Sequence, residues 1–172
     1  MPVTNENWET FARLFEAKGG PHYCWCTTYR ARNASKLSSA ERKAFMRTSV
    51  DAGVPIGVIA CKGDEPVGWC SVAPRETYVR LERSRTMPRA TPPATSTWTI
   101  LCFFVARPFR NQRIAQVLLE GAVAYARQQG AEVVEGYPFD IGGVSSTHRG
   151  HSTLFESANF QTDGKRMFRR TG

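Results

Sequence analysis

The sequence predicts a mixed α/β (α+β) fold, and three features of the chain carry this prediction. Residues 55–62 and 66–73 are apolar runs joined by Gly63-Asp64-Glu65, which is the pattern of a β-hairpin. Residues 98–137 change from a strand-like apolar run to helical spacing and back to a strand-like run. A length of 172 residues suits one domain that buries roughly 70% of the surface that its unfolded chain would expose. We therefore expect a single domain over residues 1–172.

Two helices are expected before the hairpin. Residues 5–17 carry large apolar side chains at helical spacing, and Gly19-Gly20-Pro21 ends the pattern. Residues 40–52 form a second helical pattern, which follows Ser38 or Ser39 as the N-cap. The basic side chains of this second helix are expected on a solvated face.

The segment between these helices contains Cys24-Trp25-Cys26. Two cysteines close to His22 suggest zinc, but zinc sites space their paired cysteines by about two to four residues. The chain also has no second closely spaced cysteine pair that would complete such a site. We therefore expect no metal, and we expect the segment either to pack in the core or to line a substrate pocket.

The stretch of residues 98–137 also suggests a binding site. Its polar loop, residues 109–113, leads into a helix that begins near Ile114, so unpaired backbone N–H groups of the first turn point at one spot. Arg110 and Arg113 add positive charge there, which makes a pyrophosphate a natural occupant. The alternative is an ordinary strand–helix–strand crossover with solvated arginines.

The run FFVARPFRNQRIAQVLL, residues 103–119, resembles motif A of the GCN5-related N-acetyltransferases, the GNAT superfamily. In that family the motif ends as Arg/Gln-x-x-Gly-x-Gly/Ala, which Arg110 and Ala115 match at the first and last positions. Arg113 replaces the glycine that lets the backbone approach the coenzyme A pyrophosphate closely, and it adds a charge that can partly compensate.

A second segment, LFESANF at residues 154–160, resembles the closing motif of the family, Tyr-Glu-x-x-Gly-Phe. Phe155 stands where the family often has the tyrosine that reprotonates the coenzyme thiolate, so that phenolic proton is missing. Asn159 replaces the glycine, and asparagine tolerates the left-handed conformation better than most residues. The chain is also similar to a bacterial subgroup with Cys-Trp-Cys near the N-terminus and Gly-Tyr-Pro after the third helix.

The resemblance covers about residues 56–170 and implies a GNAT-type fold. Such a fold has a mostly antiparallel central sheet flanked by helices, with one parallel strand pair splayed at the acyl-CoA cleft. The resemblance further implies direct acetyl transfer from acetyl-CoA to an amine, with the pantetheine on the backbone of residues 103–105 and a Val105 amide facing the thioester oxygen. The residues that it assigns to the cofactor are Phe103, Phe104, Val105, Arg110, Asn111, Gln112, Arg113, Ile114, Ala115 and Phe155.

The catalytic acid and base cannot be chosen from spacing alone. The main candidates are Glu135, Asp140, His148 and His151, with Glu76 and Tyr78 approaching from a loop. Three aromatic residues, Trp25, Trp69 and Tyr137, are candidates for contact with the acceptor. Cys102 is expected in the core, because nothing in the sequence identifies a base beside it. A chain of bound water is the alternative to a side-chain acid, since Phe155 has no acidic proton.

Three further segments complete the chain. Residues 75–97 form an arginine- and proline-rich insertion, which we expect to be either an acceptor lid or a floppy loop. Residues 141–150 form a loop rich in glycine and serine. Residues 161–170 are expected to be one final strand with basic side chains facing outward.

Composition narrows the choice of function without settling it. A net charge of +8 favours anionic partners, which includes both coenzyme A and nucleic acid. The arginines are dispersed and no recognised nucleic-acid motif is present, so we favour an N-acyltransferase that acts on a small-molecule or protein amine. The alternative is a catalytically degenerate GNAT-like binding module that uses its basic surface for nucleic acid or a protein partner. We expect a cytoplasmic protein without a signal peptide or membrane span, and a homodimer stays open.

Overall fold

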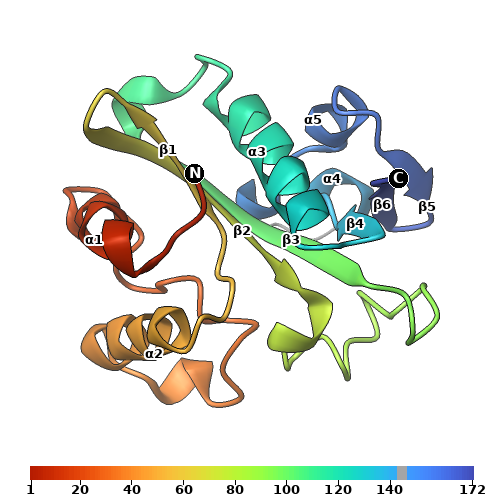
Figure 1. Ribbon diagram of the computed structural model, residues 1–172, viewed down its shortest axis with the longest axis horizontal. Helices are drawn as coiled ribbons and strands as arrows, with labels where there is room; N and C mark the ends of the chain where they lie inside the picture. Colours follow the sequence, from red (N-terminus) through yellow and green to blue (C-terminus); the bar gives the residue numbers. More distant parts are fainter. Residues whose placement is uncertain (143–146) are drawn as a thin grey trace.

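The computed structural model describes residues 1–142 and 147–172, and a six-stranded sheet forms its centre (Figure 1). The strands are β1 (Val58–Lys62), β2 (Glu65–Pro74), β3 (Thr97–Val105), β4 (Val133–Gly136), β5 (Gln161–Asp163) and β6 (Arg166–Arg170). Their order across the sheet is β1-β2-β3-β4-β6-β5. Strands β3 and β4 run parallel, and the other neighbours in this order run antiparallel. The expected mixed, mostly antiparallel sheet is therefore confirmed.

Helices cover both faces of the sheet. Helices α1 (Trp8–Glu16) and α2 (Ser39–Asp51) lie on one side, and α3 (Ile114–Gln128) and α5 (Ser152–Glu156) lie on the other (Figure 1). Strand β2 contributes side chains to the helix layers on both faces of the sheet, because successive side chains of a strand face opposite sides. Trp69 packs among the side chains of α1, whereas Cys70 packs into the core under α3.

Short helical segments join these elements. The structure contains α4 (Phe139–Gly142) and the 3-10 turns η1 (Asn5–Asn7), η2 (Ala34–Lys36), η3 (Arg75–Thr77), η4 (Arg107–Phe109) and η5 (Thr147–Arg149). Residues 143–146, which belong to the expected glycine- and serine-rich loop, lie outside the described residues. Among the helices that the structure describes, none combines the length and apolarity needed to span a lipid bilayer.

The start of α2 shows how the sequence fixes a helix end. The Ser38 hydroxyl accepts from the Glu41 amide at 3.3 Å, and the Glu41 carboxylate accepts from the Ser38 amide at 2.7 Å. These bonds to Ser38 lower the pKa of Glu41, because they favour its ionised form. Of the two serines that could cap this helix, Ser38 is therefore the N-cap.

The end of the chain differs from the sequence-based expectation of one strand. Residues 161–170 form two antiparallel strands, β5 and β6, because Gly164 adopts a positive φ of 59° and reverses the chain. The expectation that the basic side chains of this segment all face outward was also wrong. Arg166 is 8% exposed and points into the molecule, where it meets Glu135 at 3.4 Å.

The insertion between β2 and β3 is anchored to the body of the molecule. The insertion starts with the 3-10 turn η3, and Tyr78, Leu81 and Met87 from the insertion pack together with Tyr137. Arg75 pairs with the buried Glu135 and donates to the carbonyl of Met87 at 2.7 Å. These contacts do not fit a floppy loop, and they hold the insertion beside the end of β4.

Candidate active site

Strands β3 and β4 separate before β3 ends. Their pairing runs from Thr97 to Ile100 on β3, but β3 continues to Val105. On the other edge of β3, which faces β2, the Ala106 amide donates to the Val67 carbonyl at 2.9 Å. Because hydrogen-bonded and non-hydrogen-bonded pairs alternate in an antiparallel ladder, the backbone groups of Phe103 and Val105 point away from β2. They face an edge that no described strand covers, which leaves the two amides available to a ligand, while the Val105 carbonyl already accepts from Arg110 Nε.

The loop that follows this edge turns into α3 through two left-handed residues. Asn111 has a φ of 61°, and Arg113, the N-cap of α3, has a φ of 59°. Arg113 therefore takes the conformation that a glycine would adopt without strain, at a cost of about 1–2 kcal/mol for a side chain. The amides of Ile114 and Ala115 belong to the first turn, which has no intrahelical acceptors. This helix start attracts an anion.

Two cavities meet over β3. The larger one, which we call the outer groove, has a volume of about 770 Å³ and runs past the start of α3 to the loop before α5. The smaller one, which we call the inner pocket, has a volume of about 200 Å³ and lies between β3 and the segment that follows α1. Four residues line both cavities: Tyr23, Phe103, Phe104 and His148. A ligand in the outer groove can therefore reach into the inner pocket.

The outer groove brings together most of the residues that the sequence assigned to the cofactor. Its lining includes Phe103, Phe104, Val105, Arg110, Asn111, Arg113, Ile114 and Ala115. Gln112 is not among the lining residues, and its side-chain amide donates to the Pro108 carbonyl at 3.0 Å. Arg110 donates through Nε to the Val105 carbonyl at 3.1 Å, which ties the loop to the end of β3.

Phe155, in contrast, does not line the groove. Its ring is fully buried behind Phe103, with the two ring centroids 6.1 Å apart. The ring tip points at β4, because a Cβ placed on Gly136 would lie 2.7 Å from Phe155 Cζ. The expectation of a cofactor contact at Phe155 was therefore wrong, and α5 presents Thr153 and Leu154 to the groove instead.

The three aromatic side chains expected at the acceptor lie in the core. Trp25 and Trp69 are at most 1% exposed and pack against the Phe15 ring at 5.0 and 5.8 Å between centroids. Tyr137 is 2% exposed, and its hydroxyl donates to the Pro88 carbonyl at 3.1 Å. None of the three lines either cavity, so for each of them core packing is the correct alternative.

Two of the four acid–base candidates have other roles. Glu135 is fully buried and accepts from Arg75, Arg166 and Thr99, so it is not available to a substrate. Asp140 accepts from the amide and the hydroxyl of Ser152 at the start of α5. Partial burial acts to raise the pKa of Asp140, but these hydrogen bonds outweigh it and lower the pKa overall. Neither carboxylate lines a cavity.

The two histidines do reach the site. His151 lies along the outer groove, with its Nδ1 atom 3.7 Å from Asp140. His148 lines both cavities, and partial burial, together with the neighbouring Arg149 charge, lowers its pKa from 6.5. A lowered pKa keeps the His148 imidazole neutral near pH 7, which is the form that accepts a proton.

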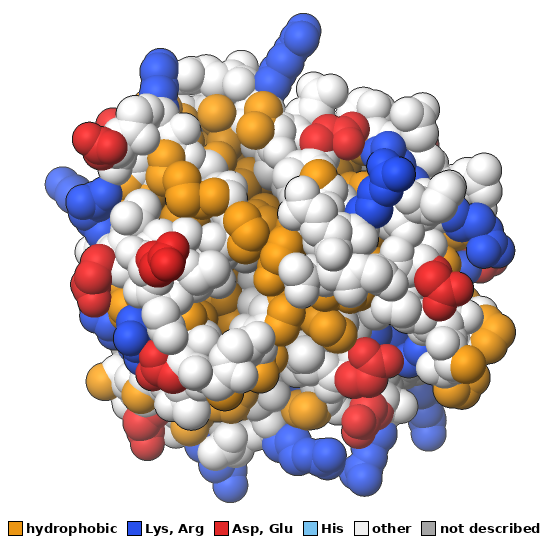
Figure 2. Space-filling model, in the orientation of Figure 1, with side chains coloured by type: hydrophobic (Ala, Val, Ile, Leu, Met, Phe, Trp, Pro, Cys, Tyr) orange, Lys and Arg blue, Asp and Glu red, His pale blue; other side chains and the backbone are white. Residues whose placement is uncertain are grey.

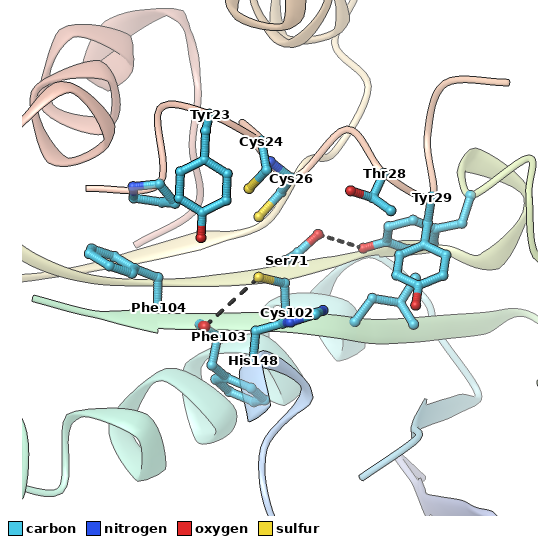
Figure 3. A pocket seen from close by; sticks show the side chains of 13 residues that line it. Tyr23, Cys24, Cys26, Thr28, Tyr29, Ser71, Cys102, Phe103, Phe104 and His148 are labelled. Carbon is cyan, nitrogen blue, oxygen red and sulfur yellow. Dashed lines mark hydrogen bonds between the residues drawn. The ribbon is translucent and has the colours of Figure 1, made fainter. Parts of the chain in front are cut away.

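Cys24 and Cys26 line the inner pocket, which is one of the two positions expected for their segment, whereas nothing in the sequence indicated that Tyr23 and Cys102 would line it too. Tyr23, Cys24 and Cys26 approach from above β3, and Cys102 lies opposite them on β3 (Figure 3). Their side-chain hydrogen bonds and burial raise the pKa values of Cys24 and Cys26, so these thiols stay protonated. The positive φ of 52° at Cys26 is the feature that turns its thiol toward the pocket, and no spacing in the sequence announces it. Among the described residues, no group of three His, Cys, Asp or Glu side chains is placed to hold a metal.

Comparison with known proteins shows to which family the chain belongs. The family model of the acetyltransferase (GNAT) family matches residues 6–137. No curated protein matches the chain.

Solved structures of similar architecture cover the whole chain. An N-acetyltransferase from Staphylococcus aureus Mu50 has 13% sequence identity and a TM-score of 0.61, and the match covers 100% of this chain and 97% of that one. A GNAT superfamily phosphinothricin acetyltransferase from Sinorhizobium meliloti, solved in complex with acetyl-CoA, has 15% identity and a TM-score of 0.58, with 100% and 87% covered. A ribosomal-protein-alanine N-acetyltransferase from Brucella melitensis has 16% identity and a TM-score of 0.56, with 99% and 98% covered. At these identities the likeness concerns the fold alone.

Proposed function

Because the chain belongs to the acetyltransferase (GNAT) family, we propose that it transfers an acetyl group from acetyl-CoA to the amine of a small molecule or a protein. The single observation that carries this proposal is the uncovered edge of β3, which leads directly into the left-handed loop and the start of α3. An extended chain of amides can pair with that edge, and a pyrophosphate can sit at the helix start.

The residues present fit acetyl-CoA in three respects. The backbone of Phe103 and Val105 offers hydrogen-bonding groups that no described strand uses, which suits the two amides of a pantetheine. The first-turn amides of α3 and the Arg113 side chain offer positive charge to the pyrophosphate. The outer groove is long and open enough, at about 770 Å³, for a ligand larger than a typical small substrate.

Acetyl-CoA, when bound, supplies an activated acetyl thioester. The Val105 amide points into the open edge of β3, so it can donate a hydrogen bond to a carbonyl oxygen whose charge increases during attack. This donor is part of the backbone and requires no particular side chain at position 105. The loop at residues 110–115 contributes by holding the donor in a fixed position.

Two titratable side chains reach both cavities, and they suit the two proton transfers. His148 is neutral near pH 7 and lies where the amine must lose its proton, so we assign it as the base. Tyr23 extends from the opposite wall toward β3 (Figure 3), and partial burial raises its pKa, so it retains its phenolic proton. Tyr23 can therefore supply the proton to the thiolate leaving group that Phe155 cannot supply. His151, which lines only the outer groove, and a water chain are the alternatives.

The distribution of charge gives the binding-module alternative no specific support. On the face in Figure 2, hydrophobic side chains gather toward the centre, while Lys and Arg side chains are scattered around the rim among Asp and Glu. A nucleic-acid surface usually concentrates its basic residues on one face or along one helix.

The test is amine-dependent release of coenzyme A thiol. Purified protein is incubated with acetyl-CoA and a panel of amines that includes amino acids, polyamines, aminoglycosides and peptides with free N-termini. We expect thiol release above the no-amine control for at least one class, and a mass increase of one acetyl group in that amine. If no amine in the panel promotes thiol release, the proposal fails and the binding module becomes the better description.

A further inference from the structure

A buried arginine supports the floor of the inner pocket. Arg30 is 4% exposed, and it donates to the Ile56 carbonyl at 2.7 Å, the Tyr78 hydroxyl at 3.0 Å and the Ser71 hydroxyl at 3.3 Å. The Tyr78 ring centroid lies 4.3 Å from the guanidinium carbon. The other partners of Arg30, a threonine hydroxyl and a proline carbonyl, are neutral as well. All of these contacts solvate the charge without neutralising it.

Two of the other three buried arginines, Arg75 and Arg166, pair with a carboxylate, whereas Arg149, which is 5% exposed, has no carboxylate partner among the described residues either. Arg75 and Arg166 share the carboxylate of Glu135, whereas no carboxylate in the described part of the chain forms an ion pair with Arg30. A buried charge without a counter-charge is costly, so proteins usually pair it. The structure therefore leaves positive potential beneath two of the hydroxyl-bearing residues that line the inner pocket, Ser71 and Tyr78.

The hydroxyl groups of Ser71 and Tyr78 have two protons, and only one of them is used in the hydrogen bond between these two groups. Ser71 Oγ and Tyr78 Oη lie 3.0 Å apart, and one of them donates to the other. Both accept from Arg30, so the second hydroxyl proton has no acceptor among the described residues. Burial raises the pKa of Tyr78 to about 12, which keeps its phenol protonated near neutral pH. The floor therefore presents an O–H donor that calls for an acceptor oxygen on the ligand.

The walls of the inner pocket limit the rest of the ligand. Tyr29, Leu101, Cys102 and Phe104 contribute apolar or weakly polar surface, and none of the described lining residues is Asp or Glu. A cationic group would find no counter-charge in this pocket, whereas an anionic group would find the potential of Arg30. The ligand that fits has an apolar body and an oxygen anion at its inner end.

The size of the ligand follows from the register of β2 on β3. Ser71 is paired with Cys102, which lies three residues before Val105, or about 10 Å along an extended strand. The hydroxyl floor and the amide assigned to the reacting carbonyl are therefore close together. A small molecule that reaches from one to the other needs its carboxylate and its amine at opposite ends of a body of several carbons, because the two groups of an α-amino acid share a single carbon.

We propose that the acceptor is a small amine that carries a carboxylate at the opposite end of an apolar body, such as an ω-amino acid, with its carboxylate on the Ser71 and Tyr78 hydroxyls above Arg30. This inference rests on the proposed function, because it names the amine that the transferase takes. It excludes polyamines as good substrates, since their second cation would enter a pocket that already contains an uncompensated positive charge.

The test compares matched ligands that differ only in the carboxylate. Dissociation constants are measured by calorimetry for 6-aminohexanoate against pentylamine and for 4-(aminomethyl)benzoate against benzylamine, in the presence of desulfo-coenzyme A. We expect at least one of the two amino acids to bind about tenfold or more tightly than its decarboxylated partner, as a hydrogen bond to a charged group provides. A difference of less than tenfold in both pairs, tighter binding of both simple amines, or no binding of any of the four overturns the inference.

Variants connect the preference to the floor. Ser71→Ala or Tyr78→Phe alone leaves the remaining hydroxyl with a proton to donate, so each single variant should keep most of the preference. The double variant loses both donors and should bring the ratio of dissociation constants close to one. Arg30→Gln provides a second measurement if the double variant does not fold, and it should reduce the ratio because it removes the charge. Arg32→Gln, at an exposed arginine two residues away, should leave the ratio unchanged. A preference that survives in both the double variant and Arg30→Gln contradicts the assignment.

The wild-type protein also separates this inference from the proposed function. If acetyl-CoA binds and an amine without a carboxylate promotes thiol release as efficiently as the matched amine with a carboxylate, the proposed acetyltransferase function is supported and only the acceptor assignment fails. If acetyl-CoA does not bind, the proposed function itself fails.

Discussion

The outer groove and the inner pocket meet over β3, but they are built in opposite ways. Much of the groove comes from one continuous stretch, residues 103–116, and its key groups are backbone amides and a helix start. The pocket collects side chains from residues 21–29, from Ser71 and Tyr78, from residues 101–104 and from His148. A site made of backbone tolerates substitutions such as Arg113, whereas a site made of side chains depends on each of them.

This difference fits the proposal that acetyl-CoA occupies the groove and that a particular acceptor occupies the pocket. The geometry of the groove follows from where β3 and β4 separate, so it is preserved as long as the sheet is preserved. The chemistry of the pocket depends on the neutral partners of Arg30 and on the turn at Cys26. Four substitutions sharpen the comparison. Those at His148 and Arg113 act on residues that line the cavities, and those at Glu135 and Phe155 act on the structure behind them.

The largest effect is expected at Glu135, which supports the insertion and β6 without lining either cavity. Glu135→Gln removes the counter-charge of two buried arginines, Arg75 and Arg166, and should lower the free energy of unfolding by about 3–5 kcal/mol. Urea denaturation checks this value. Glu120→Gln is the matched control, because its pair with Arg169 is exposed and should contribute less than about 1 kcal/mol. Equal losses in the two variants would contradict the structural role of Glu135.

The second effect is expected at the junction of the two cavities. His148→Gln should reduce the rate of acetyl transfer by about 100-fold or more if His148 is the base. In the wild type the rate should fall as the pH drops through a value below 6.5, because the pKa is lowered and protonation removes the acceptor lone pair. His151→Gln is the control, since His151 lines only the outer groove, and a loss as large as that of His148→Gln would contradict the assignment.

The same histidine has a consequence for stability that can be measured without substrate. Its pKa is lower in the folded protein than in the unfolded chain, so the unfolded chain binds the extra proton first as the pH falls. This contribution to stability is fully present above pH 6.5 and is lost as the pH falls below 6.5 toward the folded-state pKa. The His148→Gln variant should therefore lose less stability than the wild type over that interval.

The third effect tests the wall behind the groove. Phe155→Tyr would place a hydroxyl against the backbone of Gly136, so it should destabilise the protein by about 1–3 kcal/mol and give no gain in activity. Thermal unfolding and thiol release measure the two quantities. Phe103→Tyr makes the same chemical change on a ring that lines both cavities, and it should be tolerated better. Higher activity without destabilisation in Phe155→Tyr would show that this position can supply the acid after all.

The smallest effect is expected at the helix start, in the groove alone. Arg113→Gly relieves the positive φ of 59° and should stabilise the protein by up to about 1 kcal/mol, or about 2–4 °C in the unfolding midpoint. Asn111→Gly should give a smaller gain, because asparagine already tolerates a φ of 61°. A midpoint that falls in Arg113→Gly would mean that the arginine side chain contributes more contacts than its backbone costs.

The sequence predicted the groove better than the pocket, and the reason is the range of the interactions. The strand, loop and helix of residues 98–128 carry their own periodicity and turn signals, so local patterns placed Val105 at the strand end, Arg110 in the loop and Ala115 at the helix start, and all three line the outer groove. Local signals also limited the cap of α2 to Ser38 or Ser39, and the motif resemblance suggested a left-handed turn at Asn159, which has a φ of 59°.

Apart from the local turn at Gly164, which divides the last expected strand in two, the errors concern contacts between distant segments. Glu135 was a reasonable base candidate until Arg75 and Arg166, 60 and 31 residues away, were found to enclose it. Phe155 was assigned to the cofactor because its motif position suggested it, but packing against Gly136 turned its ring inward. No periodicity reports that Arg30 lies under Ser71 and Tyr78, because that contact depends on the folded positions of three elements.

The most direct test of the central claim is thermal unfolding with and without acetyl-CoA, with desulfo-coenzyme A and ATP as parallel ligands. A ligand at about 100 times its dissociation constant adds roughly 2.7 kcal/mol to the free energy of unfolding, which corresponds to several degrees in a domain of this size. The groove formed by β3 and α3 predicts such a rise with acetyl-CoA and desulfo-coenzyme A, well above the rise with ATP. An unchanged midpoint at millimolar acetyl-CoA would contradict the account, because the uncovered edge of β3 would then have no cofactor to bind.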